Sequence, residues 1–417
     1  MGAVSKAKLS WQDFFVLLIL LLFLEGSAFF VATDAFVIGV FLVFLAIFIY
    51  KGIKFDIGLV FLLALWILIN IFSILTGGRG FSAGTFIGYT IKMFIPYFAV
   101  KLVGPSFFEK FFKFCFYLVA ISSCFYIIEV IFPNLVQSLT PYLNFLEYWR
   151  MKENGDFYII VYNHLGVYNQ YYGIFPRNCG FMWEPGAYAL VLNFLIAYKI
   201  HRDSYRVDKS LALLVLAMIS TFSTAGYIGF FVLVVFFILR KGMKSAPILI
   251  PVALAVIVYA SINLYSTTDF LSGKIDEYME LGMSESTAEF NGETWERTTR
   301  FGIAAMSLEN SLHRPFGDGI CTSPYFLKKW GRVSAPNSLA TILMSWGWLG
   351  LLMLVVSIWK FNPGLKKGLG PMLLLPLCIS LFSNPYDACK YLIFAIFYYT
   401  IVCNNFKSTG YLMAILR

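Results

Sequence analysis

The chain has 417 residues, of which 59% are apolar, 19% aromatic and 13% charged, whereas an ordinary soluble domain has roughly 25% charged residues. This composition excludes a water-soluble globular enzyme and predicts a single all-α, polytopic membrane domain over residues 1–417. The net charge of +9 does not indicate a nucleic-acid partner, because the chain has no basic stripe with interleaved aromatic residues.

Twelve apolar segments predict about twelve transmembrane helices, although several are shorter than the roughly 20 residues that a perpendicular helix needs. Their soft boundaries allow a count of eleven to thirteen. Two long polar connections, over about 133–185 and 265–337, divide the segments into groups of five, four and three. In chain order the predicted segments are 14–30, 36–50, 57–75, 85–103, 114–132, 186–200, 211–222, 227–239, 246–264, 338–359, 372–382 and 391–402.

The distribution of lysine and arginine predicts the orientation in the membrane. In this arrangement 18 of the 32 Lys and Arg residues lie at the termini or in connections on the side of both termini. The positive-inside rule therefore predicts cytoplasmic N and C termini and places both long connections outside. The first apolar segment lacks a small-residue cleavage site and is expected to remain as a helix. The sequence contains no Walker A or dinucleotide-binding motif, which argues against an ATP-driven pump and against a cytosolic nucleotide-sugar transferase.

Five of the seven cysteines lie in or at the ends of predicted spans, where a thiol packs as a small apolar group. Cys179 and Cys321 lie one in each outward connection, where a disulfide could persist, and the sequence leaves that pairing open. The three histidines, His164, His201 and His313, have no metal-ligand spacing around them. We therefore expect no metal site and no cofactor.

The first outward connection is rich in aromatic residues, Tyr172 and Trp183 among them. Such rings suit either the membrane interface or stacking on sugar rings. The connection ends in the run RNCGFMWEPG over residues 177–186, which leads directly into a predicted span. Glu184 in this run has two interpretations, as a partner for the positive end of a helix dipole or as a proton acceptor at the hydrocarbon boundary.

The second outward connection contains Arg297 and Arg300, which would share one face if they lay on a helix. Together with Arg177 they could clamp a pyrophosphate, because guanidinium groups bind phosphate oxygens in a bidentate manner. The alternative is that they pair with Glu293 and Glu296 at the surface. The Gly-rich run HRPFGDG over residues 313–319 follows, and APNSL over residues 335–339 opens the tenth predicted span.

At these residues the chain resembles the superfamily of bacterial O-antigen polymerases and O-antigen ligases. The resemblance covers most of the chain. It rests on R-x-x-G-F-x-x-E-P-G at 177–186, TFSTAGYIG at 221–229, the arginine pair followed by HRPFGDG at 313–319, and APNSL at 335–339 followed by GWLG at 347–350. It implies a GT-C-like fold and a metal-independent transfer of a glycan from an undecaprenyl-pyrophosphate carrier to an acceptor sugar hydroxyl. That transfer takes place on the outer face of the bacterial inner membrane, and no nucleotide sugar takes part.

The resemblance also implies partners and residue roles. The expected partners are an undecaprenyl-pyrophosphate-linked oligosaccharide and the lipid bilayer, with a chain-length regulator protein as a further candidate. Arg177 and Arg300 are expected to hold the departing pyrophosphate, and Glu184 is expected to act as the base. The expected substrate-binding residues are Tyr172, Trp183, Arg297, His313 and Asn337.

Two departures from the family pattern favour a polymerase over a ligase. Ligases place a histidine before the asparagine where this chain has Pro336 before Asn337. The arginine that ligases often carry after the serine of the turn between spans seven and eight is also absent, since Thr224 follows Ser223. His313 could replace the missing ligase base or be purely structural. A polysaccharide polymerase is therefore the predicted function, with an O-antigen ligase as the alternative.

A secondary transporter or a lipid-linked oligosaccharide flippase is the alternative from another class. Against it, the sequence shows no internal repeat, and charges inside the predicted spans are few. Glu25, Lys92 and Glu129 are the main ones, and each is a candidate functional residue. A membrane acyltransferase would need a catalytic histidine context that neither His164 nor His313 provides.

Overall fold

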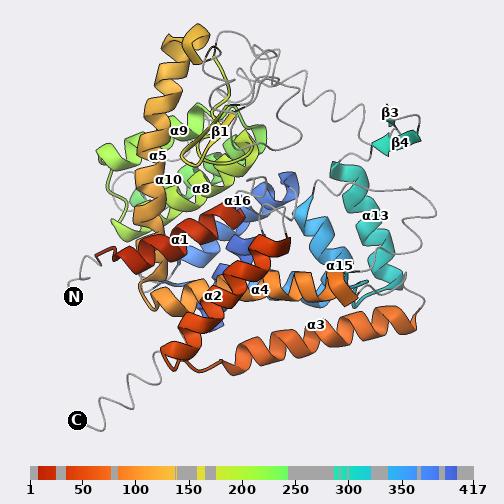
Figure 1. Ribbon diagram of the computed structural model, residues 1–417. Helices are drawn as coiled ribbons and strands as arrows, with labels where there is room; N and C mark the ends of the chain where they lie inside the picture. The colour runs from red at the N-terminus through yellow and green to blue at the C-terminus, as the bar shows by residue number, and fades with distance from the viewer. Residues whose placement is uncertain are drawn as a thin grey trace.

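The computed structural model describes residues 8–24, 34–76, 83–136, 138, 157–164, 175–242, 286–290, 293–297, 300–320, 337–363, 368–384 and 390–401. This part of the chain is mostly helical, with two short antiparallel hairpins, β1–β2 and β3–β4 (Figure 1). The elements are α1 (Trp11–Leu24), α2 (Asp34–Tyr50), α3 (Ile57–Leu75), α4 (Ala83–Val103), α5 (Phe107–Ile131), β1 (Phe157–Ile159), β2 (Tyr162–His164), α8 (Pro185–Arg202), α9 (Lys209–Ile219), α10 (Thr224–Gly242), β3 (Ser286–Phe290), β4 (Glu293–Arg297), α13 (Arg300–His313), α15 (Ser338–Lys360), α16 (Leu369–Ser383) and an unlabelled last helix, Lys390–Ile401.

Four of the described helices, α3, α4, α5 and α15, are long and apolar enough to cross a membrane. Several other apolar helices in the described ranges are shorter. Eleven of the predicted segments overlap described helices, the first of them only as far as residue 24, and the segment 246–264 lies outside the described residues. The chain thus has the apolar helices of an all-α membrane protein, while the number of spans remains a prediction.

The start of α5 corrects one predicted boundary. The predicted span began at residue 114, but α5 begins at Phe107. The prediction treated Lys110 and Lys113 as part of a connection. In the structure Lys113 pairs with Glu109 one turn earlier at 3.3 Å, and Lys110 pairs with Asp13 of α1 at 2.7 Å. Because both ammonium groups have partners at the helix end, they do not terminate the helix.

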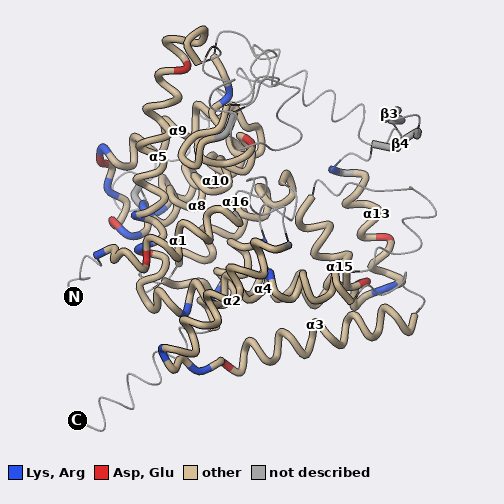
Figure 2. The backbone as a smooth tube through the Cα atoms, in the orientation of Figure 1, with Lys and Arg blue, Asp and Glu red and all other residues tan. Residues whose placement is uncertain are grey.

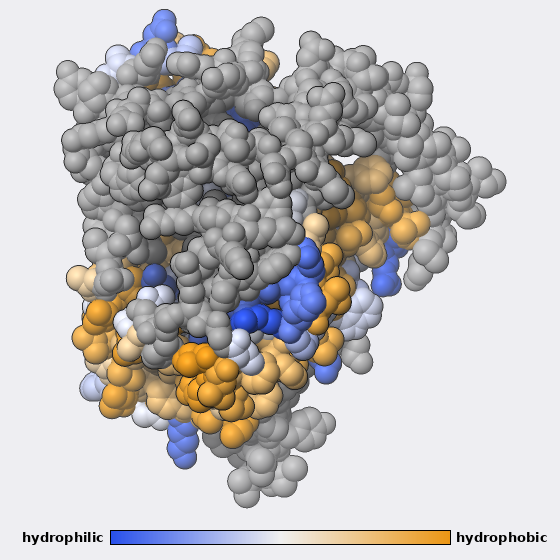
Figure 3. All heavy atoms as spheres, turned by 90° about the vertical axis from the view of Figure 1, so that its right-hand side faces the viewer, coloured by the Kyte–Doolittle hydropathy of each residue, from blue (hydrophilic) through white to orange (hydrophobic). Residues whose placement is uncertain are grey.

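Helix α3 shows why a membrane environment is expected. Its buried side chains recur every three or four residues and form one stripe, as a helix that packs on one face requires: they are Leu59, Leu62, Trp66, Ile69, Asn70 and Ser73. The remaining faces expose large apolar side chains instead of charges, including Val60, Phe61, Ile67, Leu68, Ile71 and Leu75. Figure 3, which shows the molecule from the side of α13 and the C-terminal end of α3, is hydrophobic over much of its described lower surface. Such exposure of large apolar side chains is typical of a protein that contacts lipid.

Helix α8 is the centre of the packing. Every side chain from Ala187 to His201 is buried, because α5, α9, α10 and α16 surround the helix. Small residues bring α10 close to α8: a Cβ built on Gly226 would lie 2.5 Å from the Cβ of Ala189. The amide of Asn193 completes this contact by donating to the Gly226 carbonyl at 3.1 Å. Close approach at small residues is the usual way in which membrane helices pack.

Paired charges gather at one end of the helices. Lys101 near the end of α4 lies 2.8 Å from Asp56, which precedes α3, and the Lys110–Asp13 pair joins α5 to α1 at the same end. Many of the charges of the described chain lie along the side of the molecule where α1 begins (Figure 2). This is the end that the positive-inside rule assigns to the cytoplasm.

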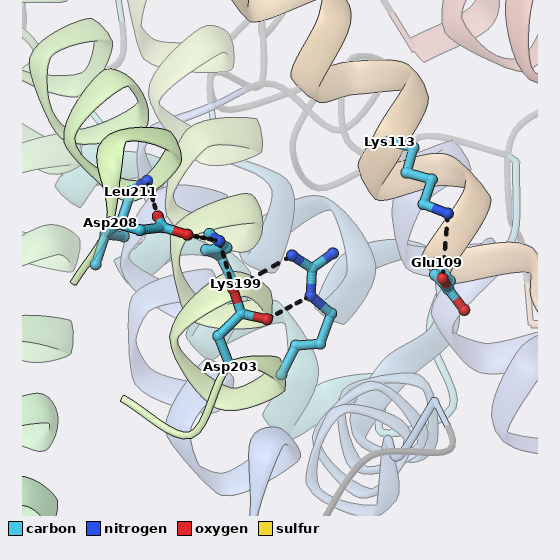
Figure 4. A network of polar contacts seen from close by, with 7 residues as sticks. Glu109, Lys113, Lys199, Asp203, Asp208 and Leu211 are labelled. Carbon is cyan, nitrogen blue, oxygen red and sulfur yellow. Dashed lines mark hydrogen bonds and ion pairs between the residues drawn. The ribbon is translucent and has the colours of Figure 1, made fainter. Parts of the chain in front are cut away.

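The turn between α8 and α9 adds a denser network at this end (Figure 4). Buried Lys199 bonds to both Asp203 and Asp208, and Arg202 donates to Asp203 at 2.8 Å. Burial raises the pKa of Asp203, but the hydrogen bonds from Arg202 and Lys199 outweigh burial and bring the pKa below its ordinary value. The hydrogen bond from Lys199 likewise lowers the pKa of Asp208. Asp208 also caps α9 by accepting from the Leu211 amide at 2.9 Å.

Helix α15 is broken at Gly347, and a turn after α13 fills the break. Gly347 has φ 64° and ψ −164°, a conformation open essentially to glycine alone. The backbone of the HRPFGDG run pairs with the helix on both sides of this residue. Three hydrogen bonds make the pairing: Asp318 N to Met344 O at 2.7 Å, Gly319 N to Ser345 O at 3.0 Å, and Trp348 N to Pro315 O at 2.9 Å.

Side chains fix the same turn in place. Asp318 is buried and accepts hydrogen bonds from Arg314 at 2.6 Å and from Asn310 at 2.8 Å. Asn70 of α3 accepts from the Ile320 amide at 3.1 Å. The Gly-rich run therefore holds α13, α15 and α3 together, which is a structural role.

Candidate functional site

The first site residue, Arg177, lies at the turn between α9 and α10. Its side chain donates to the carbonyl of Thr221 through Nε at 3.4 Å and to the carbonyl of Phe222 through Nη2 at 3.2 Å. The neighbouring Asn178 bonds to Ser220 through both its backbone and its side chain. The first two residues of the TFSTAGYIG run, Thr221 and Phe222, thus supply the carbonyls that hold the guanidinium of Arg177 in place.

The segment from Arg177 to Glu184 folds over the beginning of α8. Gly180 has φ 54°, and a Cβ at this position would lie 2.3 Å from the ring of Tyr188, so only glycine fits. Glu184 is the N-cap residue of α8 with Pro185 at the first turn, as the sequence predicts. The carboxylate is half-buried and does not cap the helix by a side-chain hydrogen bond. It lies over Gly186, since its Oε1 would be 3.4 Å from a Cβ there.

Asn384, which follows α16, connects this segment to α15. Its Nδ2 donates to the Gly186 carbonyl at 3.4 Å and to the Ser380 carbonyl at 2.7 Å. Its own carbonyl accepts from both the backbone and the hydroxyl of Ser338, at 2.9 and 2.6 Å. The first turns of α8 and α15 therefore meet at one asparagine.

Asn337 brings α13 to the same place. Its Oδ1 caps α15 by accepting from the Ala340 amide at 3.0 Å, and its Nδ2 donates to the Arg300 carbonyl at 3.2 Å. Asn337 is fully buried. The sequence predicts a substrate-binding role for Asn337, and the contacts give it a positioning role that fixes the first residue of α13, Arg300.

Four helices consequently begin near one another: α8, α13 and α15 meet around Asn384 and Asn337, and α10 begins beside Arg177. The N-terminus of a helix carries a partial positive charge and unsatisfied amide groups, which favour anions. Arg177 and Arg300 add two full positive charges to this end. Glu184 adds one negative charge at the start of α8, so the two arginines and the helix N-termini face a single carboxylate, and the arrangement suits a ligand with phosphate oxygens.

Several buried polar atoms at this end have no hydrogen-bonding partner within the described part of the chain. They are Asn384 Oδ1, Trp183 Nε1 and Thr224 Oγ1. Buried polar atoms are nearly always hydrogen-bonded in native proteins. Other buried polar atoms of this kind lie elsewhere in the described helices, for example in Trp66 and His201, so these three atoms are compatible with a polar ligand but do not by themselves mark a site.

Of the remaining predicted site residues, His313 does not join this group. Arg297 is the last residue of strand β4 and Arg300 is the first residue of helix α13, so the condition under which the two would share a helix face is not met. His313 is exposed at the last residue of α13. At 1.5 Å per residue it lies about 20 Å along the helix from Arg300, too far to share a site. Tyr172 lies outside the described residues.

Cys179 is buried, and its Sγ is 3.8 Å from the Arg177 carbonyl. Cys321 lies outside the described residues, so the disulfide stays a prediction. No group of three or more His, Cys, Asp or Glu side chains that could hold a metal is found in the described ranges.

Sequence reasoning missed one polar cluster, formed by Glu129, Tyr162 and His164. Glu129, near the end of α5, is buried and accepts from the Tyr162 hydroxyl, and its Oε1 lies 2.9 Å from His164 Nδ1. Glu129 was recognisable as a charge within a span. Its partners lie more than thirty residues away on the β1–β2 hairpin, and no sequence spacing reveals them.

Fold and site together define an all-α protein of the membrane type, with cationic and amide groups gathered where four helices begin. Comparisons of the chain with protein-family models, with curated proteins and with solved structures give no match.

Proposed function

We propose that the chain is a polysaccharide polymerase of the bacterial inner membrane, as the family resemblance implies. It transfers a glycan from an undecaprenyl-pyrophosphate carrier to the hydroxyl of an acceptor sugar, on the outer face. The observation that carries this proposal is the meeting of Arg177 and Arg300 with the beginnings of α8, α10, α13 and α15. A departing pyrophosphate needs fixed positive groups of this kind, because negative charge develops on it as the glycosidic bond breaks.

The surroundings of the two arginines support the same chemistry. The guanidinium of Arg177 is held by two backbone carbonyls, so its position is fixed before a substrate arrives. Arg300 is fixed through its backbone by Asn337. Such preorganised groups stabilise developing charge without having to reorganise during the reaction. The apolar surfaces of helices such as α3 give a polyprenyl tail access from the bilayer.

Reconstitution tests the proposal. The purified full chain is placed in lipid vesicles with an undecaprenyl-pyrophosphate-linked oligosaccharide repeat, without ATP, nucleotide sugar or divalent metal, and products are resolved by length. We expect a ladder of longer glycans. Movement of the lipid-linked oligosaccharide between leaflets without lengthening would instead make the protein a flippase. Transfer only to a lipid A-core acceptor would make it a ligase.

Substitution of the arginines tests the proposed site. Arg177→Ala and Arg300→Ala are each expected to lower the transfer rate by about 100-fold or more, the range found when one charge-stabilising donor is removed. Arg206→Ala is the matched control, because Arg206 is exposed near the opposite end of α8. The amount of each variant in the membrane is measured alongside. Full activity in both arginine variants would refute the pyrophosphate site.

A further inference from the structure

A buried carboxylate and an imidazole meet at the outer end of α5. The side chain of Glu129 is 4% exposed and that of His164 is 11% exposed. The Nδ1 atom of His164 lies 2.9 Å from one carboxylate oxygen, and the Tyr162 hydroxyl donates to the other. Both carboxylate oxygens thus have a partner, while the imidazole keeps an exposed portion.

The hairpin that carries His164 lies on the segment between Arg177 and Glu184. The amide of Asn163 donates to the Gly180 carbonyl at 2.8 Å, and its side chain donates to the Met182 carbonyl at 3.1 Å. Helix α5 contacts the beginning of the same segment, since the Tyr126 hydroxyl donates to the Pro176 carbonyl at 2.9 Å. The two elements that carry the Glu129–His164 pair, α5 and the β1–β2 hairpin, therefore contact the chain at Pro176, Gly180 and Met182, in or directly before the segment that forms the proposed site.

We propose that His164 is the general base of the transfer and that Glu129 positions it, an inference that rests on the proposed function. With its Nδ1 proton donated to Glu129, the neutral imidazole carries its lone pair on Nε2. Nε2 takes the proton of the acceptor hydroxyl while the acceptor oxygen bonds to C1 of the donor sugar. The bond from C1 to the phosphate oxygen breaks, and its electron pair leaves with the lipid pyrophosphate. Glu129 stabilises the imidazolium that results, and the proton then passes to solvent.

The two nearest alternatives as bases are Glu184 and Tyr162. Glu184 is the N-cap residue of α8, and its Oε1 atom lies over Gly186, 3.4 Å from where a Cβ of that residue would be. Burial, followed by the charge of Glu129, raises the pKa of Tyr162 well above its ordinary value. Tyr162 therefore keeps its proton and serves as a donor to Glu129.

Nitrogen-15 NMR of the histidines tests the geometry without an activity assay. The chain has only three histidines, so variants at His201 and His313 assign the signal of His164 in labelled protein in micelles. We expect a neutral His164 protonated at Nδ1 at the pH at which the protein is active. A signal protonated at Nε2, or at both nitrogens, at that pH would overturn the proposal.

Glu129→Gln provides a sharper test of the same signal. The Tyr162 hydroxyl donates to one oxygen of Glu129, so the glutamine oxygen should face Tyr162 and its NH2 group should face His164. That NH2 donates to Nδ1 and forces the proton of the imidazole onto Nε2. We expect the tautomer to switch and the transfer rate to fall, and an unchanged tautomer would remove the positioning role of Glu129.

Kinetics with matched variants separate a base from a hairpin anchor. His164→Gln is expected to lower kcat by about 100-fold to 10,000-fold, the usual contribution of a general base, with donor binding changed by less than about twofold. Tyr162→Phe removes a hydrogen bond to the same carboxylate without removing the base. It is expected to retain most activity. Equal losses in both variants would mean that His164 only anchors the hairpin.

Two outcomes of these assays distinguish a failure of the proposed role of His164 from a failure of the proposed function. If wild-type protein builds the ladder and Glu184→Gln loses activity while His164→Gln does not, the polymerase stands and the base is Glu184. If wild-type protein builds no ladder with its native donor and acceptor, the proposed function fails, and the His164 role falls with it even where the NMR tautomer is as expected.

Discussion

Replacing Gly347 by alanine is expected to destabilise the protein strongly, because the break in α15 depends on this glycine. A Cβ at residue 347 would lie 2.1 Å from the Pro315 carbonyl oxygen and 2.5 Å from the carbonyl carbon of Phe316. Both are backbone atoms, so no side-chain movement relieves the clash. The backbone conformation itself, with φ 64° and ψ −164°, costs a residue with a side chain about 1–3 kcal/mol.

The loss of the docked turn adds to this cost. Three backbone hydrogen bonds join the turn to α15, and each contributes about 0.5–1.5 kcal/mol net. Conformational strain and lost hydrogen bonds together give about 3–7 kcal/mol. The apparent Tm should fall by about 5 °C or more, measured by fluorescence-detected size-exclusion chromatography after heating in detergent. Because such unfolding is often irreversible, wild type and variant are heated at one rate.

Gly88→Ala in α4 is the matched control for this measurement. Nothing lies within 4 Å of a Cβ at Gly88, and its backbone is helical. Alanine is also the better helix former, so the control should melt at or slightly above the wild-type temperature. If Gly347→Ala melts together with the wild type, the docking of the 313–319 run on α15 does not contribute to stability and the structural interpretation is wrong.

Two other predictions concern residues away from the proposed site. Asp208→Asn keeps the cap of α9 but loses the ion pair with Lys199, whereas Asp208→Ala loses both interactions. The alanine variant should therefore be less stable than the asparagine variant by about 1 kcal/mol, the usual contribution of a helix cap. The pKa of Asp208 is lowered in the folded protein. The ion pair therefore contributes its full stabilisation above about pH 4, the ordinary pKa range of a free Asp, and this stabilisation is lost as the pH falls through the lowered pKa. The difference in Tm between wild type and Asp208→Asn should thus be constant between pH 6 and 8 and close in acid, whereas a difference that grows in acid would contradict the ion pair. His313→Ala should retain transfer activity in the reconstituted assay, because His313 is exposed and about 20 Å from Arg300, and a loss comparable to that of Arg300→Ala would return His313 to the site.

The sequence predicts most of the helices because a membrane helix is a local feature. An apolar run must satisfy its own backbone hydrogen bonds, and the helix is the way to do so within one segment. The start of α8 is predicted correctly for a similar reason, since proline favours the first turn. The start of α5 is missed because Lys110 finds its partner, Asp13, about a hundred residues earlier. Where a charge depends on a distant partner, local composition misplaces the boundary.

The site is less predictable because its contacts join distant segments. Arg177 and Glu184 are recognisable as polar residues at the beginning of a span, but the carbonyls that hold Arg177 come more than forty residues later. Asn384 resembles an ordinary loop residue in the sequence, yet it joins the first turns of α8 and α15. The contacts of His164 with Glu129 are equally invisible to spacing. Only the assembled helices bring these groups together.

The motifs that suggest the family divide into two kinds when their contacts are considered. The HRPFGDG run fills the break in α15, and the TFSTAGYIG run supplies both the carbonyls around Arg177 and the close contact of Gly226 with Ala189. Both are explained by packing and backbone geometry, which constrain residue size and conformation. The 177–184 segment and Arg300 instead bring charged groups to the meeting point of the helix N-termini, which packing alone does not require. Substitutions in the first kind should therefore lower stability and activity together, whereas Arg300→Ala should lower activity while the protein keeps its Tm. Arg177→Ala should lower both, because it also removes the hydrogen bonds to the Thr221 and Phe222 carbonyls.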